Sequence, residues 1–312
     1  MIQVKNLVKD YGGKKALDGV SFEIEKGRIY GLLGPNGAGK TTTMNIMTGY
    51  IAATEGSVSI DGFDIFEDAP EAKKRIGYLP EVPPVYPDMT VREYLEFAAE
   101  LKKVPAKSKG ERIKRVMEQV DISDMRDRLI KNLSKGYRQR VGIAQALIGD
   151  PEVVILDEPT VGLDPKQIIE IRELIRSLGE KHTVILSSHI LSEVNAICDH
   201  IIIISGGKLI ASDTPEGLAE SFAGEGAYIY SVKGELEAVR RALAFAGEGV
   251  SVSAGEDGLA KVEVKTKADI REDIFAALAE AGCPIMELRA ASRTLEDIFI
   301  ELTDESEEVI AK

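Results

Sequence analysis

The chain has 312 residues, 44% hydrophobic and 29% charged, which is enough for about two soluble domains. Its net charge of −13, with the acidic excess concentrated after Ser221, disfavours nucleic-acid binding, since that requires a surplus of lysine and arginine. The apolar runs are far shorter than the ~18 residues that span a bilayer, and we expect no signal peptide and no transmembrane segment. The two cysteines, Cys198 and Cys283, lack metal-ligand spacing.

The chain up to residue 221 alternates short β-rich runs with segments of helical periodicity. This alternation is typical of an α/β domain with a largely parallel sheet. The strands are expected at IQVKNL, GVSFEIE, RIYGLLG, SVSIDG, KRIGYLP, VVILDE, TVILSSH, HIIIIS and GKLIAS.

A helical subdomain interrupts this pattern between about residues 83 and 150. It opens with Thr90 and Glu93, which have the spacing of a helix capping box. The apolar residues that follow recur at helical spacing and predict one buried face. They are Val91, Leu95, Ala98 and Leu101. Residues 1–221 are therefore predicted to form a mixed sheet with an inserted helical subdomain.

Residues 222–312 are expected to form a second, small α+β domain. Their strand and helix patterns follow the order βαββαβ of a ferredoxin-like module. The strands are expected at AYIYSVKG, VSVSAG, LAKVEVKT and PIMELRAA, and the helices at ELEAVRRALAFAG and DIREDIFAALAEAG. A final amphipathic helix is predicted from Leu295, Ile298, Phe299 and Leu302.

A phosphate-binding loop follows the apolar strand at residues 29–33 and matches G-x-x-x-x-G-K-[ST]. Its glycines let backbone amides approach phosphate oxygens next to a helix N-terminus. Lys40 is expected to reach the β and γ phosphates, and Thr41 to ligate Mg²⁺. The alternative is a glycine-rich turn that binds nothing. The candidate nucleotide-binding residues are Gly34, Pro35, Asn36, Gly37, Ala38, Gly39, Lys40, Thr41 and Thr42.

A phosphate loop needs a carboxylate partner that binds its metal ion. Two carboxylates, Asp157 and Glu158, directly follow the apolar strand at residues 153–156. Asp157 is the candidate Mg²⁺ residue. Glu158 would polarise the attacking water as a general base. His189 follows another buried strand, so it is expected at the same sheet edge, holding Glu158 and the water in line.

Four ordered motifs, GPNGAGKTT, LSKGYRQR, LDEPTVGLDP and SSH, together resemble the nucleotide-binding subunit of an ABC transporter, over roughly residues 2–221. The resemblance implies a P-loop NTPase fold and MgATP as ligand. It also implies that Ser134 and Gly136, in the signature motif LSKGY, meet the γ phosphate of ATP held by the opposite protomer.

The sequence departs from the family pattern at three positions. Lys135 and Tyr137 replace the glycine and glutamine of the common LSGGQ form, and Lys135 is expected either to add positive charge near the phosphate or to point to solvent. Glu81 stands where the family usually has a glutamine that contacts Mg²⁺, and a carboxylate can also ligate this cation.

Two further residues are matched by the resemblance. Tyr11 corresponds to the aromatic side chain that stacks on adenine, or else is a half-buried residue at a strand end. Asp164 corresponds to a loop that crosses the dimer interface, although an Asp before Pro165 also has a local explanation as a turn residue.

The resemblance implies an ATPase that forms a head-to-tail homodimer and drives transport through separate integral-membrane permease subunits. It implies a peripheral position on the cytoplasmic face of the membrane, and the trailing module favours export. One alternative is an ABC-type ATPase without transport, acting in translation or DNA maintenance. Another is a mainly regulatory subunit whose C-terminal module senses a ligand, although stabilising the dimer is the simpler role for that module. The cargo is not predicted.

Overall fold

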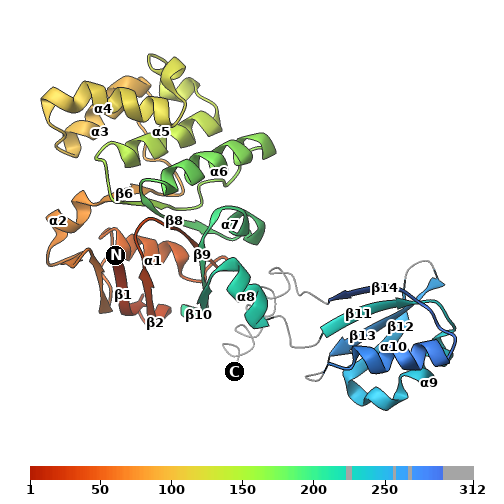
Figure 1. Cartoon of the computed structure of the whole chain (residues 1–312). Helices are drawn as coiled ribbons and strands as arrows, with labels where there is room; N and C mark the ends of the chain where they lie inside the picture. Colours follow the sequence, from red (N-terminus) through yellow and green to blue (C-terminus); the bar gives the residue numbers. More distant parts are fainter. Residues whose placement is uncertain (223–226, 256–257, 266–268, 291–312) are drawn as a thin grey trace. The chain divides into compact units, whose positions relative to one another are not determined.

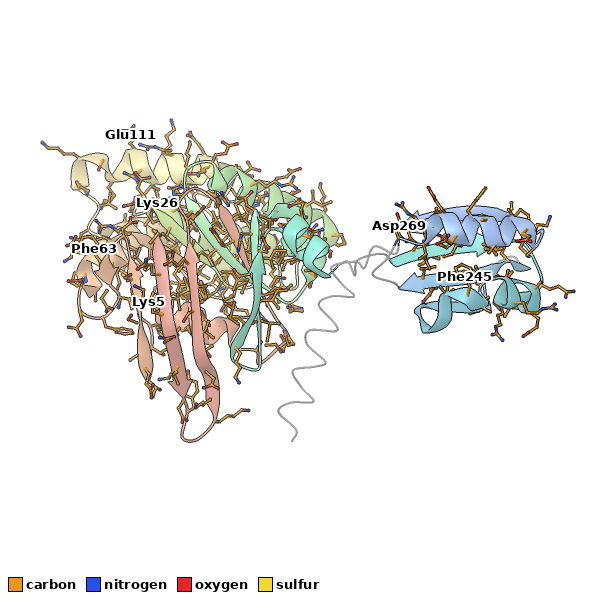
Figure 2. All side chains as sticks on the ribbon, turned by 60° about the horizontal axis from the view of Figure 1, so that its bottom comes forward. Lys5, Lys26, Phe63, Glu111, Phe245 and Asp269 are labelled. Atoms are coloured by element: carbon orange, nitrogen blue, oxygen red, sulfur yellow. The ribbon has the colours of Figure 1, made fainter. Side chains whose placement is uncertain are left out.

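The chain folds into two compact units. The first covers Met1–Pro215 and the second begins at Glu216. Lys5 and Lys26 mark the first unit in Figure 2, and Phe245 marks the second. The computed structural model describes residues 1–222, 227–255, 258–265 and 269–290 (Figure 1). The final helix predicted from Leu295, Ile298, Phe299 and Leu302 lies outside these ranges.

Two sheets build the first unit. One is antiparallel, with strand order β2-β1-β4-β5. The other has the order β10-β9-β3-β8-β7-β6 and is parallel except where β10 pairs with β9, which confirms the mixed sheet. The strands are β1 (Ile2–Asp10), β2 (Lys15–Ile24), β3 (Ile29–Leu33), β4 (Glu55–Ile60), β5 (Phe63–Asp64), β6 (Ile76–Leu79), β7 (Val153–Leu156), β8 (Thr183–Ser188), β9 (His200–Ser205) and β10 (Lys208–Asp213).

A continuous apolar core joins the two sheets through the helix α1 (Lys40–Met47). Met44 and Met47 of this helix are completely buried, as is Ile60 of the antiparallel sheet. Burying one such side chain contributes ~1.5–3 kcal/mol. The core therefore fixes the start of α1, and with it the loop that connects β3 to the helix.

The helical subdomain lies between β6 and β7, and Figure 1 shows its helices gathered on the β6 side of the sheet. The capping box is confirmed, because the Glu93 amide donates to Thr90 Oγ1 while Glu93 Oε2 accepts from the Thr90 amide. Leu101 was wrongly assigned to the buried face: it is 67% exposed, being the last residue of its helix. The helices here are α3 (Val91–Leu101), α4 (Ala106–Gln119), η1 (Ser123–Met125), η2 (Ile130–Asn132) and α5 (Lys135–Leu147).

Two further helices of the first unit pack against the central parallel strands. α6 contacts β8, whereas α7 contacts both β3 and β8. They therefore help to hold the central strands whose ends carry the candidate site residues. The remaining helices of the first unit are α2 (Ala69–Lys74), α6 (Pro165–Gly179) and α7 (Leu191–Ile197), and α8 (Pro215–Phe222) spans the division between the units.

The second unit has the predicted order βαββαβ and one antiparallel sheet, β12-β13-β11-β14. Its own core includes Tyr230 and Val262 from the sheet, with Ile274 and Leu278 from a helix. The elements are β11 (Ala227–Val232), α9 (Leu236–Ala242), η3 (Ala244–Gly249), β12 (Val250–Ala254), β13 (Ala260–Lys265), α10 (Arg271–Glu280) and β14 (Ile285–Ala290).

Candidate functional site

The loop between β3 and α1 depends on glycine backbone conformations. Gly39 has φ of 108°, in the left-handed region, and a Cβ there would lie 2.7 Å from the Ala16 carbonyl oxygen. A larger residue would therefore be both strained and obstructed. Lys40 starts α1 and folds back over the loop, donating to the carbonyl oxygens of Gly34 at 2.8 Å and Pro35 at 3.2 Å.

The Lys40 ammonium is nearly buried, with 6% of the residue exposed. Burial lowers the pKa of this group, whereas the carboxylates of Glu158, Asp157 and Glu81 oppose the shift. Its Nζ lies 3.8 Å from Glu158 Oε1. A buried cation at the start of a helix is well placed to bind an anionic phosphate.

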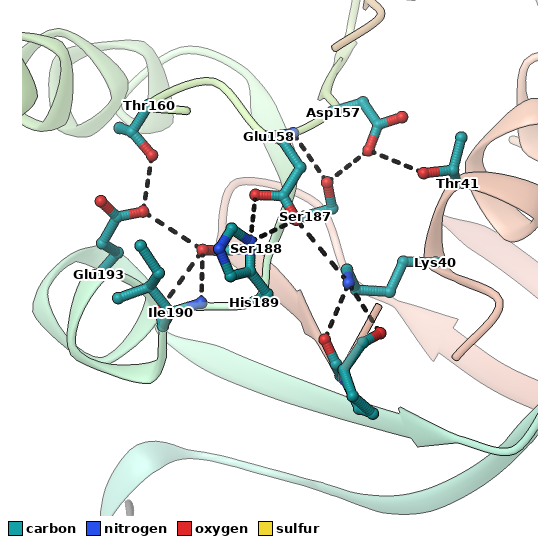
Figure 3. Close-up of polar contacts among 12 residues, drawn as sticks. Lys40, Thr41, Asp157, Glu158, Thr160, Ser187, Ser188, His189, Ile190 and Glu193 are labelled. Atoms are coloured by element: carbon teal, nitrogen blue, oxygen red, sulfur yellow. Dashed lines mark hydrogen bonds and ion pairs between the residues drawn. The ribbon is translucent and has the colours of Figure 1, made fainter. Parts of the chain in front are cut away.

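A serine connects the Asp157 carboxylate to the backbone amide of Glu158, just after β7 (Figure 3). Ser187 Oγ donates to Asp157 Oδ1 at 2.6 Å and accepts from the Glu158 amide at 2.8 Å. Asp157 Oδ1 also accepts from Thr41 Oγ1 at 3.5 Å. The sequence interpretation missed Ser187, although its place at the end of a buried strand is the same signal that selected His189.

Glu158 and His189 lie side by side (Figure 3). His189 Nδ1 is 3.1 Å from Glu158 Oε1 and 3.0 Å from Oε2. Glu158 has φ of 47°, a left-handed conformation that costs a residue other than glycine ~1–3 kcal/mol. Backbone strain of this kind is concentrated at functional sites, and here it lies at the predicted general base.

A cavity of about 360 Å³ collects most of the predicted catalytic and phosphate-loop residues. Glu81 is exposed and lies on its wall. Lys40 and Thr41 connect this wall to Gly34, Pro35 and Asp157 by hydrogen bonds. Ala38, within the loop, is buried. The residues lining the cavity are Ala16, Asn36, Gly37, Gly39, Lys40, Thr41, Thr42, Glu81, Glu158, Val161 and His189, of which Ala16 and Val161 were not predicted.

The predicted signature residues line a different cavity, of about 630 Å³. Ser134 caps α5, with its Oγ accepting from the Tyr137 amide at 3.4 Å. Gly136 packs on Gln167, which a Cβ would approach to 2.8 Å. Asp164 caps α6 by accepting from the Gln167 amide at 2.9 Å, so its local explanation holds in the structure. The signature turn at Ser134 and Gly136 therefore packs against the start of α6, and it lines a different cavity from the phosphate loop.

Two other predicted positions lie outside the first cavity. Lys135 is exposed, and its ammonium lies beside Gly162, in the loop that leads from Glu158 to α6. Tyr11 directly follows β1 and is 54% exposed, which fits the alternative of a half-buried residue at a strand end, and Lys9 Nζ lies 5.0 Å from its ring centroid. Because Lys9 already lies over this ring, stacking of Tyr11 on adenine stays a prediction.

Comparisons with known proteins decide the family. Residues 17–161 match the family model described as ABC transporter. The linearmycin resistance ATP-binding protein LnrL of Bacillus subtilis is 34% identical, over 97% of this chain and 98% of that protein. The chain belongs to the ABC transporter ATP-binding proteins.

Two further similarities extend this assignment. The Nod factor export ATP-binding protein I of Cupriavidus metallidurans is 35% identical, over 78% of this chain and 80% of its own length. A solved dimeric ATP-binding cassette, MJ0796 in a post-hydrolysis state with ADP and Pi, is 26% identical with a TM-score of 0.62, covering 69% of this chain and 98% of that one.

This ABC protein therefore carries an ATP-binding ATPase domain, and its fold is that of the ABC cassettes. The matched residues include the loop around Lys40 and the carboxylates Asp157 and Glu158. Within the described ranges, no helix is both long and apolar enough to span a membrane.

Proposed function

We propose that two copies of this chain bind two MgATP molecules head to tail and power an exporter. The observation that carries the proposal is the separation of Ser134 and Gly136 from Lys40: they line different cavities of one chain. A second copy can complete each site by bringing its signature turn to the phosphate loop. The dimeric state of the MJ0796 cassette supports this arrangement.

Each residue then has a chemical role. Lys40 and the loop amides bind the phosphates, and Tyr11 stacks on the adenine. Glu158 accepts a proton from the attacking water, while His189 orients the Glu158 carboxylate and donates toward the γ phosphate. Asp164 continues to cap α6, and its loop forms part of the interface between the two copies.

Magnesium fits the donor set at the rim of the first cavity. Thr41, Asp157 and Glu81 present hard oxygen atoms, which are the ligands that Mg²⁺ prefers. Bound there, the ion would neutralise charge that develops on the phosphates. Ser187 keeps Asp157 turned toward Thr41 for this purpose.

Export and membrane partners are inferred from the relatives. One relative is named for Nod factor export and another for linearmycin resistance. We infer that integral-membrane permease subunits hold the dimer at the cytoplasmic face of the membrane. We also infer that the residues from about 222 onward form a separate accessory domain.

The test compares Glu158→Gln with a matched control at the other end of the same strand. Glu158→Gln keeps the shape of the site but removes the base, so ATP affinity should stay within about threefold, on the scale of ~0.6 kcal/mol, while turnover falls ~10²–10⁴-fold. Glu152→Gln changes an exposed carboxylate before β7 and should hydrolyse ATP like the wild type. Turnover and ATP binding are measured separately.

Lys40→Ala completes the test. It removes the buried ammonium at the phosphate loop, so ATP binding itself should be lost. Rapid hydrolysis by Glu158→Gln would remove Glu158 as the base, and normal ATP binding by Lys40→Ala would remove the loop as the phosphate site.

A further inference from the structure

Strand β14 forms one edge of the sheet in the second unit. Within the described residues its strand partner is β11. Met286 and Leu288 on this strand are 59% and 48% exposed. Edge strands present backbone N–H and C=O groups to other strands, and proteins commonly protect such edges. An edge that also exposes large apolar side chains is suited to pairing with another strand.

The opposite edge of the same sheet differs in chemistry. Arg240 Nη2 donates to the Val252 carbonyl oxygen of β12 at 3.1 Å, so a side chain of the unit already occupies part of that edge. The exposed side chains of β12 include Ser251 and Ser253, which are small and polar. The β12 edge is therefore partly covered by the Arg240 side chain, and the β14 edge is the one suited to pairing with another strand.

The order of side chains along β14 identifies the partner. Glu287 and Arg289 flank Leu288, and both are exposed. If two β14 strands pair antiparallel with Leu288 opposite Leu288, each Glu287 lies opposite Arg289 of the other copy. Opposite charges directly across two strands are attractive and like charges are repulsive. The strand is therefore complementary to itself.

We propose that β14 pairs with β14 of a second copy of this chain around a two-fold axis through the Leu288 pair. A two-fold interface uses the same surface on both copies, as this pairing does. Glu287 Oε2 accepts from Ser231 Oγ at 3.4 Å in its own unit, and no ion pair joins Glu287 or Arg289 to another described residue. Both charges are thus available to the second copy.

This interface needs no nucleotide, and it is independent of the ATP-dependent contact proposed above. It holds two chains together when ATP is absent, which raises the effective concentration of each ATPase unit for the other. The two contacts are separable by experiment, because nucleotide-free association reports on β14 alone.

The proposal is tested with variants that exchange the charges at Glu287 and Arg289. Sedimentation of the full chain without nucleotide measures their self-association. Glu287→Arg and Arg289→Glu should each weaken self-association by about tenfold or more, since each replaces two attractive pairs with repulsive ones. The double variant E287R/R289E restores attraction and should associate like the wild type. A mixture of the two single variants should form mixed dimers, because E287R then faces R289E.

Cross-linking locates the contact. Residues directly opposite in antiparallel strands have Cα atoms ~4.5–5.5 Å apart, within disulfide range. Leu288→Cys should therefore form a covalent dimer under mild oxidation, whereas Phe275→Cys, at an exposed position of α10, should not. A wild-type chain that is monomeric without nucleotide would overturn the proposal. So would single charge variants that associate normally, or a mixture that does not restore pairing.

Discussion

Ser187 connects the Asp157 carboxylate to the backbone of Glu158, the two residues on which the proposed hydrolysis depends. Its side chain is completely buried and satisfies both Asp157 and the backbone amide of the strained Glu158. A buried amide that loses its acceptor costs about 1–3 kcal/mol. We therefore infer that Ser187 positions the Asp157 carboxylate and the Glu158 backbone, and that it need not touch the nucleotide.

Ser187→Ala should lower both stability and turnover. The free energy of unfolding should fall by about 1–3 kcal/mol because the Glu158 amide is left unpaired. The ATPase kcat should fall as well, because Asp157 loses its orienting donor. Urea denaturation and steady-state kinetics measure the two effects.

Ser188→Ala is the matched control for this prediction. Ser188 is equally buried, but its hydroxyl contacts Glu193 and the Ile190 amide. Within the described residues it makes no hydrogen bond to Asp157 or Glu158. The Ser188→Ala variant should have a lower free energy of unfolding, and its ATPase kcat should stay unchanged. Equal kinetic effects of the two variants would contradict the role assigned to Ser187.

The strands and the loop that hold the candidate site residues could be predicted from short stretches of the sequence. The alternating apolar runs predicted the strands, and the glycine spacing predicted the loop before Lys40. The expectation that His189 shares a sheet edge with Glu158 is confirmed by the parallel pairing of β7 and β8. Ala16 could not be found in this way, because it reaches the loop from the antiparallel sheet.

Helix α6 offers a test of a single element. Asp164 caps it, and Asp164→Ala should lower the free energy of unfolding by about 1 kcal/mol. Asp164→Asn and Asp164→Ser keep a side-chain acceptor, so they should lose only a few tenths of a kcal/mol. Urea denaturation compares the three variants, and equal losses in all of them would contradict the capping role.

Across the whole first unit, an ion network joins segments that are distant in sequence. Asp61 binds the Met1 amine at 2.5 Å and Lys26 at 2.7 Å, and Lys26 also binds Glu152. No single segment of the sequence signals such a network, because its members come together only when the two sheets pack. It fixes the chain start next to the parallel sheet.

The network predicts a pH dependence of stability. Partial burial alone would raise the Asp61 pKa, but Lys26 and the Met1 amine hold that pKa below its ordinary value. A carboxyl with a depressed folded pKa stabilises the fold above its unfolded pKa and loses this contribution as the pH falls. Asp61→Asn should therefore cost about 1 kcal/mol at pH 7, and the difference from wild type should shrink below about pH 4.

Denaturation across this pH range checks the sign. Asp127→Asn, at an exposed aspartate with surface ion pairs, is the control and should show little difference at any pH. A difference for Asp61→Asn that grew as the pH fell would contradict the assignment.

We propose that this ATPase works in an assembly with integral-membrane subunits. Tagged Glu158→Gln chain, purified with ATP from detergent-solubilised host membranes and followed by mass spectrometry, tests it most directly. We predict a multispanning membrane protein in stoichiometric amount, retained more strongly by Glu158→Gln than by the wild type. A soluble dimer alone, or one accompanied by ribosomes or DNA-maintenance proteins, would contradict the transporter account.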